Sequence, residues 1–251
     1  MFSVSISTNN LTIGYDHHIV QSNLNFELHS GEMVCMLGPN GCGKSTLLRT
    51  LAGLQPALQG TFTISHTPTG GTPSNSFTEA SHIALVLTER LSLENTTIHD
   101  VVAMGRYPYT SFLGGLSETD EQIINQSLTD VGLTGTAHTF FNDHSDGEKQ
   151  RALIAKALTQ ETPIILLDEP TAHLDLPNRI RILQMLRRVA REQRKTILIS
   201  THELDLAIKL SDRIMLMTPQ KGIQLDTATN LRATGAFTAA FGMDIFNPLT
   251  V

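Results

Sequence analysis

One eight-residue run constrains the fold and chemistry of this chain more than any other feature. It consists of Gly38, Pro39, Asn40, Gly41, Cys42, Gly43, Lys44 and Ser45. The run fits the pattern G-x-x-x-x-G-K-S/T, in which glycines let the backbone curl with its N–H groups turned toward a phosphate. Lys44 can reach the β- and γ-phosphates, and the Ser45 hydroxyl can bind Mg2+. The run therefore predicts a site for a nucleoside triphosphate.

The flanking residues argue against a chance match in a glycine-rich turn. Met33–Leu37 has the composition of a short buried strand that leads into the loop. Thr46–Ala52 has the composition of a helix that leaves it, so we expect Thr46 to lie beside the nucleotide as well.

Several short apolar runs predict strands that are covered on both faces, as in a parallel sheet. They are Ile83–Leu87, Ile164–Leu167, Ile197–Ile199 and Ile214–Met217. Leu24, Phe26 and Leu28 instead alternate with polar residues, which predicts one half-buried strand in an N-terminal antiparallel part. The fold class is therefore α/β, with a mainly parallel sheet.

The stretch from about Glu89 to Gln160 is rich in helical patterns and has no clear strand. One helix is expected to begin at Thr119, with Gln122 completing a capping box, and to stop at Gly132. We therefore predict one domain over residues 1–251, with a core of 1–87 and 161–251 and a helical subdomain of 88–160.

Composition narrows the class of partner and compartment. A formal net charge of −6 gives no reason to expect nucleic acid as a partner. There is no apolar window near 18 residues and no secretory signal pattern. The two cysteines, Cys35 and Cys42, have no disulfide or zinc spacing, which favours a reducing, cytoplasmic compartment. His17, His18 and His99 form no ligand cluster, so we expect them on the surface or in loops.

A second chemical site follows a buried strand at Ile164–Thr171. Asp168 ends the apolar run and is placed to hold Mg2+, directly or through water. Glu169 is placed to orient and polarise a water beside the γ-phosphate. The alternative is a plain strand end with solvated acids, but the upstream phosphate loop favours a catalytic pair.

Taken together, the ordered motifs resemble the ATP-binding subunits of ABC transporters over essentially the whole chain. The phosphate loop is followed by Ser145-Asp-Gly-Glu-Lys-Gln-Arg151, which is similar to the family's signature, usually LSGGQ followed by x-Q-R. Three further segments also match: Leu166–Thr171, the D-loop-like Ala172–Asp175, and Ile199–Glu203 with the switch histidine His202.

The resemblance implies roles for particular residues. Lys44, Glu169 and His202 would be catalytic, with His202 close to the γ-phosphate. Tyr15 sits where the family stacks an aromatic ring on adenine, although an ordinary turn tyrosine is the alternative. Ser145, Gly147 and Glu148 would contact ATP held by a second copy, since a helix N-terminus favours phosphate. ATP and Mg2+ are the implied cofactors, and a head-to-tail homodimer the implied assembly.

Some positions depart from the family pattern. His144 replaces the signature's leucine, Asp146 its first glycine and Glu148 its glutamine. Thr88 stands where the family has a glutamine, and the neighbouring Glu89 could supply an oxygen ligand to magnesium. The added negative charge beside a triphosphate bears on the rate of hydrolysis more than on nucleotide binding.

Further segments resemble importers of ferric siderophores, haem and cobalamin, with iron complexes ahead of cobalamin. They are Val101–Tyr109, Thr171–Leu176 and His202–Ala207. This resemblance implies membrane permease subunits docked near residues 88–109 and, indirectly, a periplasmic or surface substrate-binding protein. The protein would then lie peripherally on the cytoplasmic face of the inner membrane.

Alternatives remain at this point. One is a nucleotide-gated module with weak hydrolysis, and another is an ABC ATPase for a different transport substrate. A soluble ABC protein of DNA repair or translation would usually carry a long coiled-coil insertion or two ATP domains.

Cys42 lies at a helix N-terminus that should lower the pKa of its thiol. Alkylation of Cys42 should therefore block ATP binding, and ATP bound beforehand should protect the thiol from alkylation.

Overall fold

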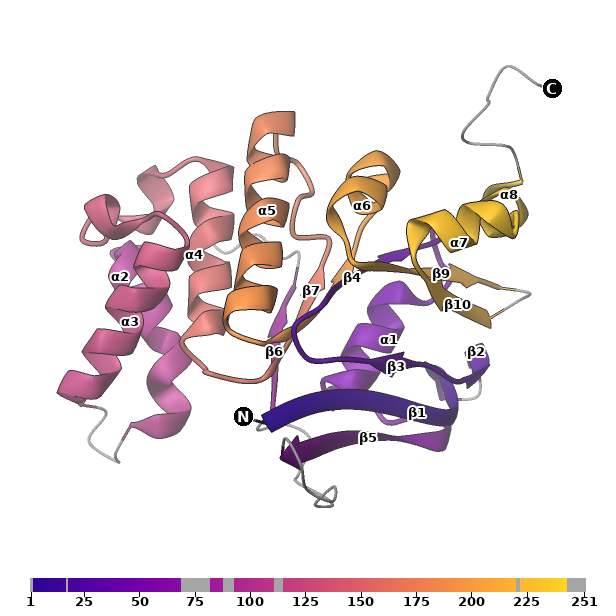
Figure 1. The fold of residues 1–251 in the computed structure, drawn as a ribbon. Helices are drawn as coiled ribbons and strands as arrows, with labels where there is room; N and C mark the ends of the chain where they lie inside the picture. The colour runs from indigo at the N-terminus through magenta and orange to yellow at the C-terminus, as the bar shows by residue number, and fades with distance from the viewer. Residues whose placement is uncertain are drawn as a thin grey trace.

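A six-stranded sheet forms the centre of the molecule (Figure 1). The computed structural model describes residues 2–16, 18–68, 82–87, 93–110, 115–219 and 222–242. The strand order is β10-β9-β4-β8-β7-β6. Their bounds are β4 Met33–Leu37, β6 Ile83–Val86, β7 Ile164–Asp168, β8 Thr196–Ser200, β9 Arg213–Thr218 and β10 Gly222–Asp226. All neighbours pair in parallel except the β9–β10 hairpin, which confirms the expected mainly parallel sheet.

A second sheet is built around the long first strand, with β2, β3 and β5 all pairing antiparallel to β1. The bounds are β1 Phe2–Tyr15, β2 His18–Leu24, β3 Glu27–Leu28 and β5 Gln59–Pro68. Leu24, Phe26 and Leu28 are all buried, as their alternation predicts, but they do not form one strand. The chain bends between β2 and β3, where Phe26 exchanges hydrogen bonds with Thr8 instead of continuing a ladder.

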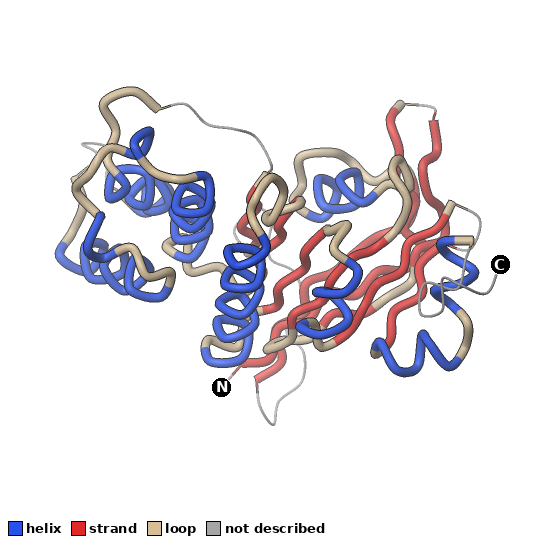
Figure 2. Tube along the Cα trace, turned by 90° about the horizontal axis from the view of Figure 1, so that it is seen from above, coloured by secondary structure: helices blue, strands red, loops and turns tan. Residues whose placement is uncertain are grey.

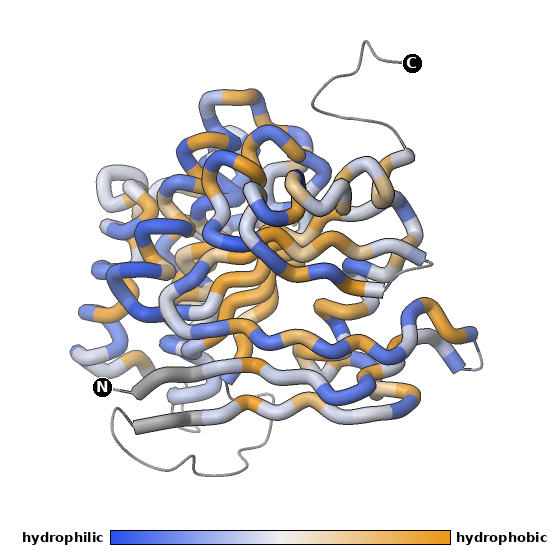
Figure 3. Tube along the Cα trace, turned by 45° about the vertical axis from the view of Figure 1, so that its right-hand side comes forward, coloured by the Kyte–Doolittle hydropathy of each residue, from blue (hydrophilic) through white to orange (hydrophobic). Residues whose placement is uncertain are grey.

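Two hydrophobic cores lie on opposite faces of the central sheet, and β4 contributes alternate side chains to them. Val34 and Met36 face the core that packs α1 (Lys44–Leu51) and the N-terminal sheet. Met33, Cys35 and Leu37 face the other core, beneath the remaining helices. The helices outside the helical lobe on that side are α5 Leu176–Glu192, α6 Leu204–Leu210, α7 Ala228–Ala233 and α8 Ala236–Phe241. Figure 3 shows the apolar strands concentrated in the middle of the molecule.

The chain between β6 and β7 forms a helical lobe beside the sheet, as expected (Figures 1 and 2). Its described helices are α2 Ile98–Ala103, η2 Met104–Tyr109, α3 Glu118–Asp130, η3 Thr134–Thr136, η4 Phe141–Asp143 and α4 Asp146–Leu158. The expected start of α3 at Thr119 is wrong. Ser117 caps the helix and Asp120 completes the capping box. An aspartate at the third helical position can reach back to the cap residue, so Ser117 and Asp120 replace the expected pair of Thr119 and Gln122. Within the described ranges, no helix is both long and apolar enough to cross a membrane.

Candidate nucleotide-binding site

The phosphate loop connects β4 to α1, and two of its glycines are required for different reasons. Gly43 has φ 106°, a left-handed conformation that side chains rarely adopt, and it precedes the first residue of α1. Gly38 lies against β9, where an added Cβ would sit 2.2 Å from the carbonyl oxygen of Met217. The loop therefore depends on a distant strand as well as on its own backbone freedom.

Lys44 is the buried cation of this loop. Its side chain is almost fully buried, and Nζ donates hydrogen bonds to the carbonyl oxygens of Gly38 at 2.9 Å and Pro39 at 3.2 Å. Two neutral carbonyls do not cancel a buried ammonium charge, so an anion placed beside Lys44 would be strongly favoured.

A cavity of about 490 Å3 opens over the loop. Its lining comprises Tyr15, His18, Val20, Asn40, Gly41, Gly43, Lys44, Ser45, Thr46 and Glu169. The N-terminal sheet thus supplies one wall, and the loop and the end of β7 supply the others. Most of the expected nucleotide contacts are brought together in this one space.

Tyr15 stands at the edge of the cavity and is held in place by its hydroxyl. The Tyr15 hydroxyl lies 3.1 Å from Thr46 Oγ1 in the first turn of α1, while the residue stays 46% exposed. A ring fixed at one end and exposed on its face can stack on a planar base. This geometry supports the adenine-stacking hypothesis over that of an ordinary turn tyrosine.

His18 and Val20 are cavity residues that the sequence did not reveal. The expectation that His18 lies on the surface is confirmed, because it is exposed, and the pairing of β2 with β1 also sets it opposite Tyr15 at the cavity. His17 lies outside the described residues. A short connection between two strands was the available signal, since hairpins place such residues side by side. His99 lies on α2 and is partly exposed, with Nε2 3.0 Å from Glu121.

The end of β7 carries the two expected carboxylates. Asp168 is buried and accepts a hydrogen bond from Ser200 Oγ at 2.5 Å. Glu169 follows with φ 46°, and its N–H donates to Ser200 Oγ and O, at 2.9 and 3.1 Å. Such strain in a residue with a side chain persists only where its surroundings hold it, here β8.

His202 pairs with Glu169 across the strand ends. Nε2 of His202 lies 2.5 Å from Oε1 of Glu169, and both side chains are partly exposed. The strand order puts β8 beside β7, so residues 33 apart in the sequence meet at the carboxyl edge of the sheet. The site therefore contains a carboxylate oriented by an imidazole next to a phosphate-binding loop.

The signature-like residues lie apart from this cavity, at the N-terminus of α4. Ser145 caps the helix, and Gly147 packs close to Asn178 of α5, whose atoms would lie 3.1 Å from an added Cβ. Neither they nor Glu148 belong to the described lining of the cavity. One subunit therefore does not bring the two groups together around a single nucleotide.

The expected low pKa of Cys42 is wrong. Cys42 is 1% exposed, and burial raises the pKa of its thiol although nearby Lys44 acts to lower it. Desolvation of the thiolate outweighs the positive end of the helix. The expected magnesium ligand Glu89 and its neighbour Thr88 lie outside the described residues.

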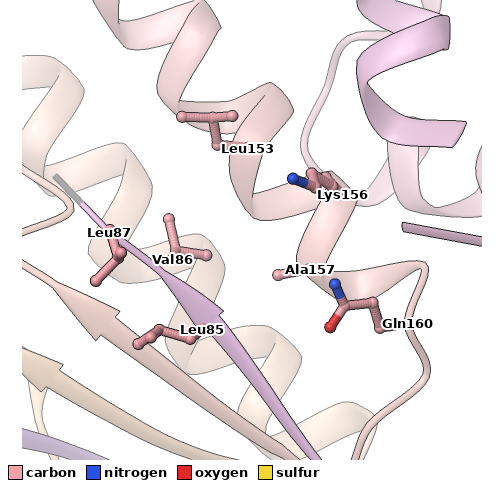
Figure 4. Close-up of a pocket in the computed structure, with 7 residues that line it drawn as sticks. All are labelled: Leu85, Val86, Leu87, Leu153, Lys156, Ala157 and Gln160. Atoms are coloured by element: carbon pink, nitrogen blue, oxygen red, sulfur yellow. The ribbon is translucent and has the colours of Figure 1, made fainter. Parts of the chain in front are cut away.

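A smaller groove of about 220 Å3 lies between the end of β6 and α4 (Figure 4). Leu85, Val86 and Leu87 form its strand wall, and Leu153, Lys156, Ala157 and Gln160 form its helix wall. The Tyr109 hydroxyl donates to the carbonyl oxygen of the lining residue Gln160 at 2.6 Å. The groove, with an apolar strand wall and the polar side chains of Lys156 and Gln160 on its helix wall, lies on the junction between the helical lobe and the sheet.

The fold and the loop define a class of protein, the P-loop nucleotide-binding ATPases with a helical insertion. Comparison with known proteins then gives the family. The ABC transporter family model matches residues 21–172. An uncharacterized ABC transporter ATP-binding protein of Methanocaldococcus jannaschii is 38% identical over 87% of this chain and 74% of its own length.

Two further similarities agree with that match. The iron(3+)-hydroxamate import ATP-binding protein of Bacillus subtilis is 32% identical over 96% of this chain and 88% of its own. A solved ABC transporter assigned to the metal-chelate type, in an inward-facing conformation, superimposes with a TM-score of 0.82. The two sequences are 30% identical, and the superposition covers 96% of this chain and 90% of the other. The chain belongs to the ABC transporter family, as one of its ATPase subunits.

Proposed function

We propose that this ATPase powers the import of a metal chelate, with ferric siderophores ahead of haem and cobalamin. The observation that supports this most is the similarity, along nearly the whole chain, to a hydroxamate-import subunit and a metal-chelate-type transporter. Substrate would cross through permease subunits of the membrane, so no side chain of this subunit selects it. A substrate-binding protein would deliver it from the other side, with this subunit peripheral on the cytoplasmic face.

ATP would bind with its base on Tyr15 and its phosphates in the loop. Lys44 would exchange its two carbonyl partners for β- and γ-phosphate oxygens, which are charged and therefore stronger acceptors. The loop N–H groups and the start of α1 would hold the remaining phosphate oxygens.

The residues at the loop and at the end of β7 fit a magnesium ion. The Ser45 hydroxyl and the Asp168 carboxylate are hard oxygen donors, and α1 contacts β7, so the two elements that carry them are adjacent. Mg2+ held by these residues would neutralise phosphate charge. Glu89 stays a proposed third ligand.

Hydrolysis would depend on the pair Glu169 and His202. Glu169 would accept a hydrogen bond from water and orient it toward the γ-phosphate. His202 holds the carboxylate at 2.5 Å in this structure and would bond the γ-phosphate when ATP is present. The strained backbone of Glu169, fixed by Ser200, would keep the carboxylate aimed at the cavity.

A second copy would complete each site head to tail. Ser145 and Gly147 would offer their donors to the γ-phosphate of the partner's ATP, since they do not line the cavity of their own subunit. Leu176 supports this arrangement, because it is 57% exposed at the start of α5, two residues before the Asn178 that packs on Gly147. ATP would bind the closed dimer more tightly than the open one, and this difference in affinity would drive the closure that moves the membrane subunits.

The membrane partner would dock at the groove between β6 and α4 and on the adjacent η2. Tyr107 and Tyr109 are exposed there, at 61% and 52%, and the Tyr109 hydroxyl is bonded to Gln160 of the helix wall of the groove. An amphipathic helix of the permease is the kind of element that such a groove accepts.

The substitution Glu169→Gln tests the proposed chemistry. The variant should bind ATP with the affinity of the wild type but hydrolyse it at least a hundredfold more slowly, because it cannot polarise water. It should also accumulate as an ATP-bound dimer, which size-exclusion chromatography with MgATP would detect. Turnover at the wild-type rate would rule out Glu169 as the base.

The wild-type subunit, co-purified with its membrane subunits, tests the substrate. A ferric hydroxamate, haem and cobalamin, each with its binding protein, would be compared for stimulation of ATP hydrolysis. A nucleotide-gated module with weak hydrolysis is the second candidate, favoured by the acidic residues Asp146 and Glu148 at the start of α4. Absence of turnover in the complete assembly would select it.

A further inference from the structure

The N-terminus of α4 is closed by one of its own side chains. Oε2 of Glu148 accepts hydrogen bonds from the Ser145 hydroxyl at 2.7 Å and from the Ser145 N–H at 3.1 Å. The Glu148 N–H lies 3.4 Å from Ser145 Oγ, which completes the capping box. A single carboxylate oxygen thus occupies both donors of Ser145.

These are the donors that the proposed function assigns to the partner's γ-phosphate. A phosphate oxygen and the Glu148 carboxylate are both acceptors only, so they cannot share one hydroxyl hydrogen. The Ser145 hydroxyl and N–H also hold the pKa of Glu148 below its usual value, so the carboxylate is ionised near neutral pH. Approach of ATP therefore brings a negative charge toward a negative charge.

Among the described residues, no lysine or arginine is paired with this carboxylate, and the titratable group that faces it is His144. His144 Nδ1 lies 3.5 Å from Glu148 Oε2, and its Nε2 lies 2.6 Å from Thr139 Oγ1. Since Thr139 donates its hydroxyl hydrogen to the Thr136 carbonyl, Nε2 must be the donor to Thr139. His144 also helps to lower the pKa of Glu148, but less than the Ser145 hydroxyl and N–H do.

The nearest lysine points elsewhere, and a second capping box shows the contrast. Lys149 Nζ donates to the carbonyl oxygen of Asn142 and lies over the ring of Phe141. In the capping box of α3, by comparison, Asp120 accepts a hydrogen bond from the buried guanidinium of Arg106 at 2.7 Å. The capping carboxylate of α4 differs because, among the described residues, no arginine or lysine is bonded to it.

We propose that Glu148 is a positioning residue that competes with the partner's γ-phosphate for Ser145 and so weakens closure of the ATP dimer. This inference rests on the proposed function, because it assumes that Ser145 acts across a homodimer. ATP must displace the carboxylate from Ser145 before the site can close, so the carboxylate opposes closure at each of the two sites.

The test measures the dimer dissociation constant with saturating MgATP by analytical ultracentrifugation, in the Glu169→Gln background. Adding Glu148→Gln keeps a residue that completes a capping box but removes the charge. We expect the loss of each Glu148 charge to favour the closed state about tenfold. Because a closed dimer contains two such sites, the dimer dissociation constant should fall roughly a hundredfold. The difference should shrink as salt is raised, since salt screens the repulsion.

Two further variants separate charge from helix capping. Glu148→Asp keeps the charge and the capping chemistry that α2 and α3 already use, so it should stay close to the parent. Asp100→Asn removes the equivalent carboxylate from the cap of α2, outside the nucleotide site, and should change nothing in the dimer. Urea unfolding of each variant would show that all of them fold.

The outcomes distinguish the two proposals. If the Glu169→Gln parent does not dimerise with ATP, the proposed dimer mechanism fails and this inference fails with it. If the parent dimerises but Glu148→Gln is equal to it or weaker, the competition is wrong and the proposed function stands. Tightening that is unaffected by salt would likewise reject an electrostatic role for Glu148.

Discussion

Two glycines of the phosphate loop are required for different reasons, one set by the loop itself and one by a distant strand. The pattern predicts glycines at both ends of the loop, but only the structure gives their separate reasons. Gly43 is needed for its positive φ, whereas Gly38 is needed because β9 approaches its Cα. The second reason is invisible in the motif, since Met217 lies far along the chain.

Cys42 carries a prediction at this scale. Burial raises the thiol pKa of Cys42, and it raises that of Cys35 to about 12. Because the thiolate is the nucleophile, iodoacetamide should label the native protein slowly at pH 7 and faster as the pH rises. Intact mass spectrometry at pH 7 and pH 9 would follow the reaction.

Urea-unfolded protein, in which both thiols are exposed, is the control for that labelling. It should react at both positions within the same time. Once Cys42 is labelled, ATP binding should be lost, and ATP bound beforehand should slow the labelling further. Complete labelling of the native protein within minutes at pH 7 would contradict the burial of this thiol.

At the scale of elements, Arg106 joins the helical lobe to the core. Its buried guanidinium donates to Asp120 of α3, to the Thr159 carbonyl after α4 and to Glu161 before β7, all within 2.8 Å. It also lies 4.1 Å from the centre of the Tyr109 ring. One side chain thus ties η2, α3 and the end of α4 together beside the proposed docking surface.

The cap of α3 makes the acid stability of this region measurable. Hydrogen bonds from the Ser117 hydroxyl and N–H, and then from Arg106, lower the pKa of Asp120 from 3.8 to about 2. Since the folded pKa is the lower one, this stabilisation is complete above pH 3.8 and is lost as the pH falls toward 2. The free energy of unfolding should therefore decline over that window.

The variant Ser117→Ala should flatten that decline, because it removes the largest cause of the shift. It should also cost about 1 kcal/mol near neutral pH through loss of the helix cap. Urea unfolding at pH 6, 4, 3 and 2.5 would measure both effects, with the exposed Ser22→Ala as control. An unchanged slope in Ser117→Ala would show that the cap does not control Asp120.

At the scale of the whole molecule, the nucleotide cavity and the groove are separate surfaces. The nucleotide cavity lies at the carboxyl edge of the sheet, and the groove lies where the helical lobe joins the sheet. The helix α4 runs between the groove and the signature-like residues, since Ser145 caps its start and Ala157, near its end, lines the groove. Movement of the docking surface would therefore reach the signature residues through one helix.

Filling the groove tests this separation of surfaces. The variant Gln160→Trp places a large ring at the mouth of a cavity of about 220 Å3. It should leave ATP binding and ATP-driven dimerisation intact but reduce co-purification with the membrane subunits at least tenfold. Gln122→Trp, on the exposed face of α3, is the matched control and should assemble normally.

The sequence predicted the parallel core, the helical insertion, the loop and both carboxylates, because those signals are local. A strand, a helix or a phosphate loop is specified by neighbours within about ten residues. The same local rules misplaced the start of α3, where the sequence offers two alternative capping boxes, Ser117 with Asp120 and Thr119 with Gln122. They also joined β2 and β3 into one strand, because burial alternates across the bend.

Only the tertiary structure decided how distant residues meet. It brought His202 to Glu169, set β9 against Gly38, and buried Cys42 so that desolvation outweighed the helix terminus. Which groups share a cavity or compete for one hydrogen depends on strand order and packing, and these are contacts between segments that local sequence does not specify.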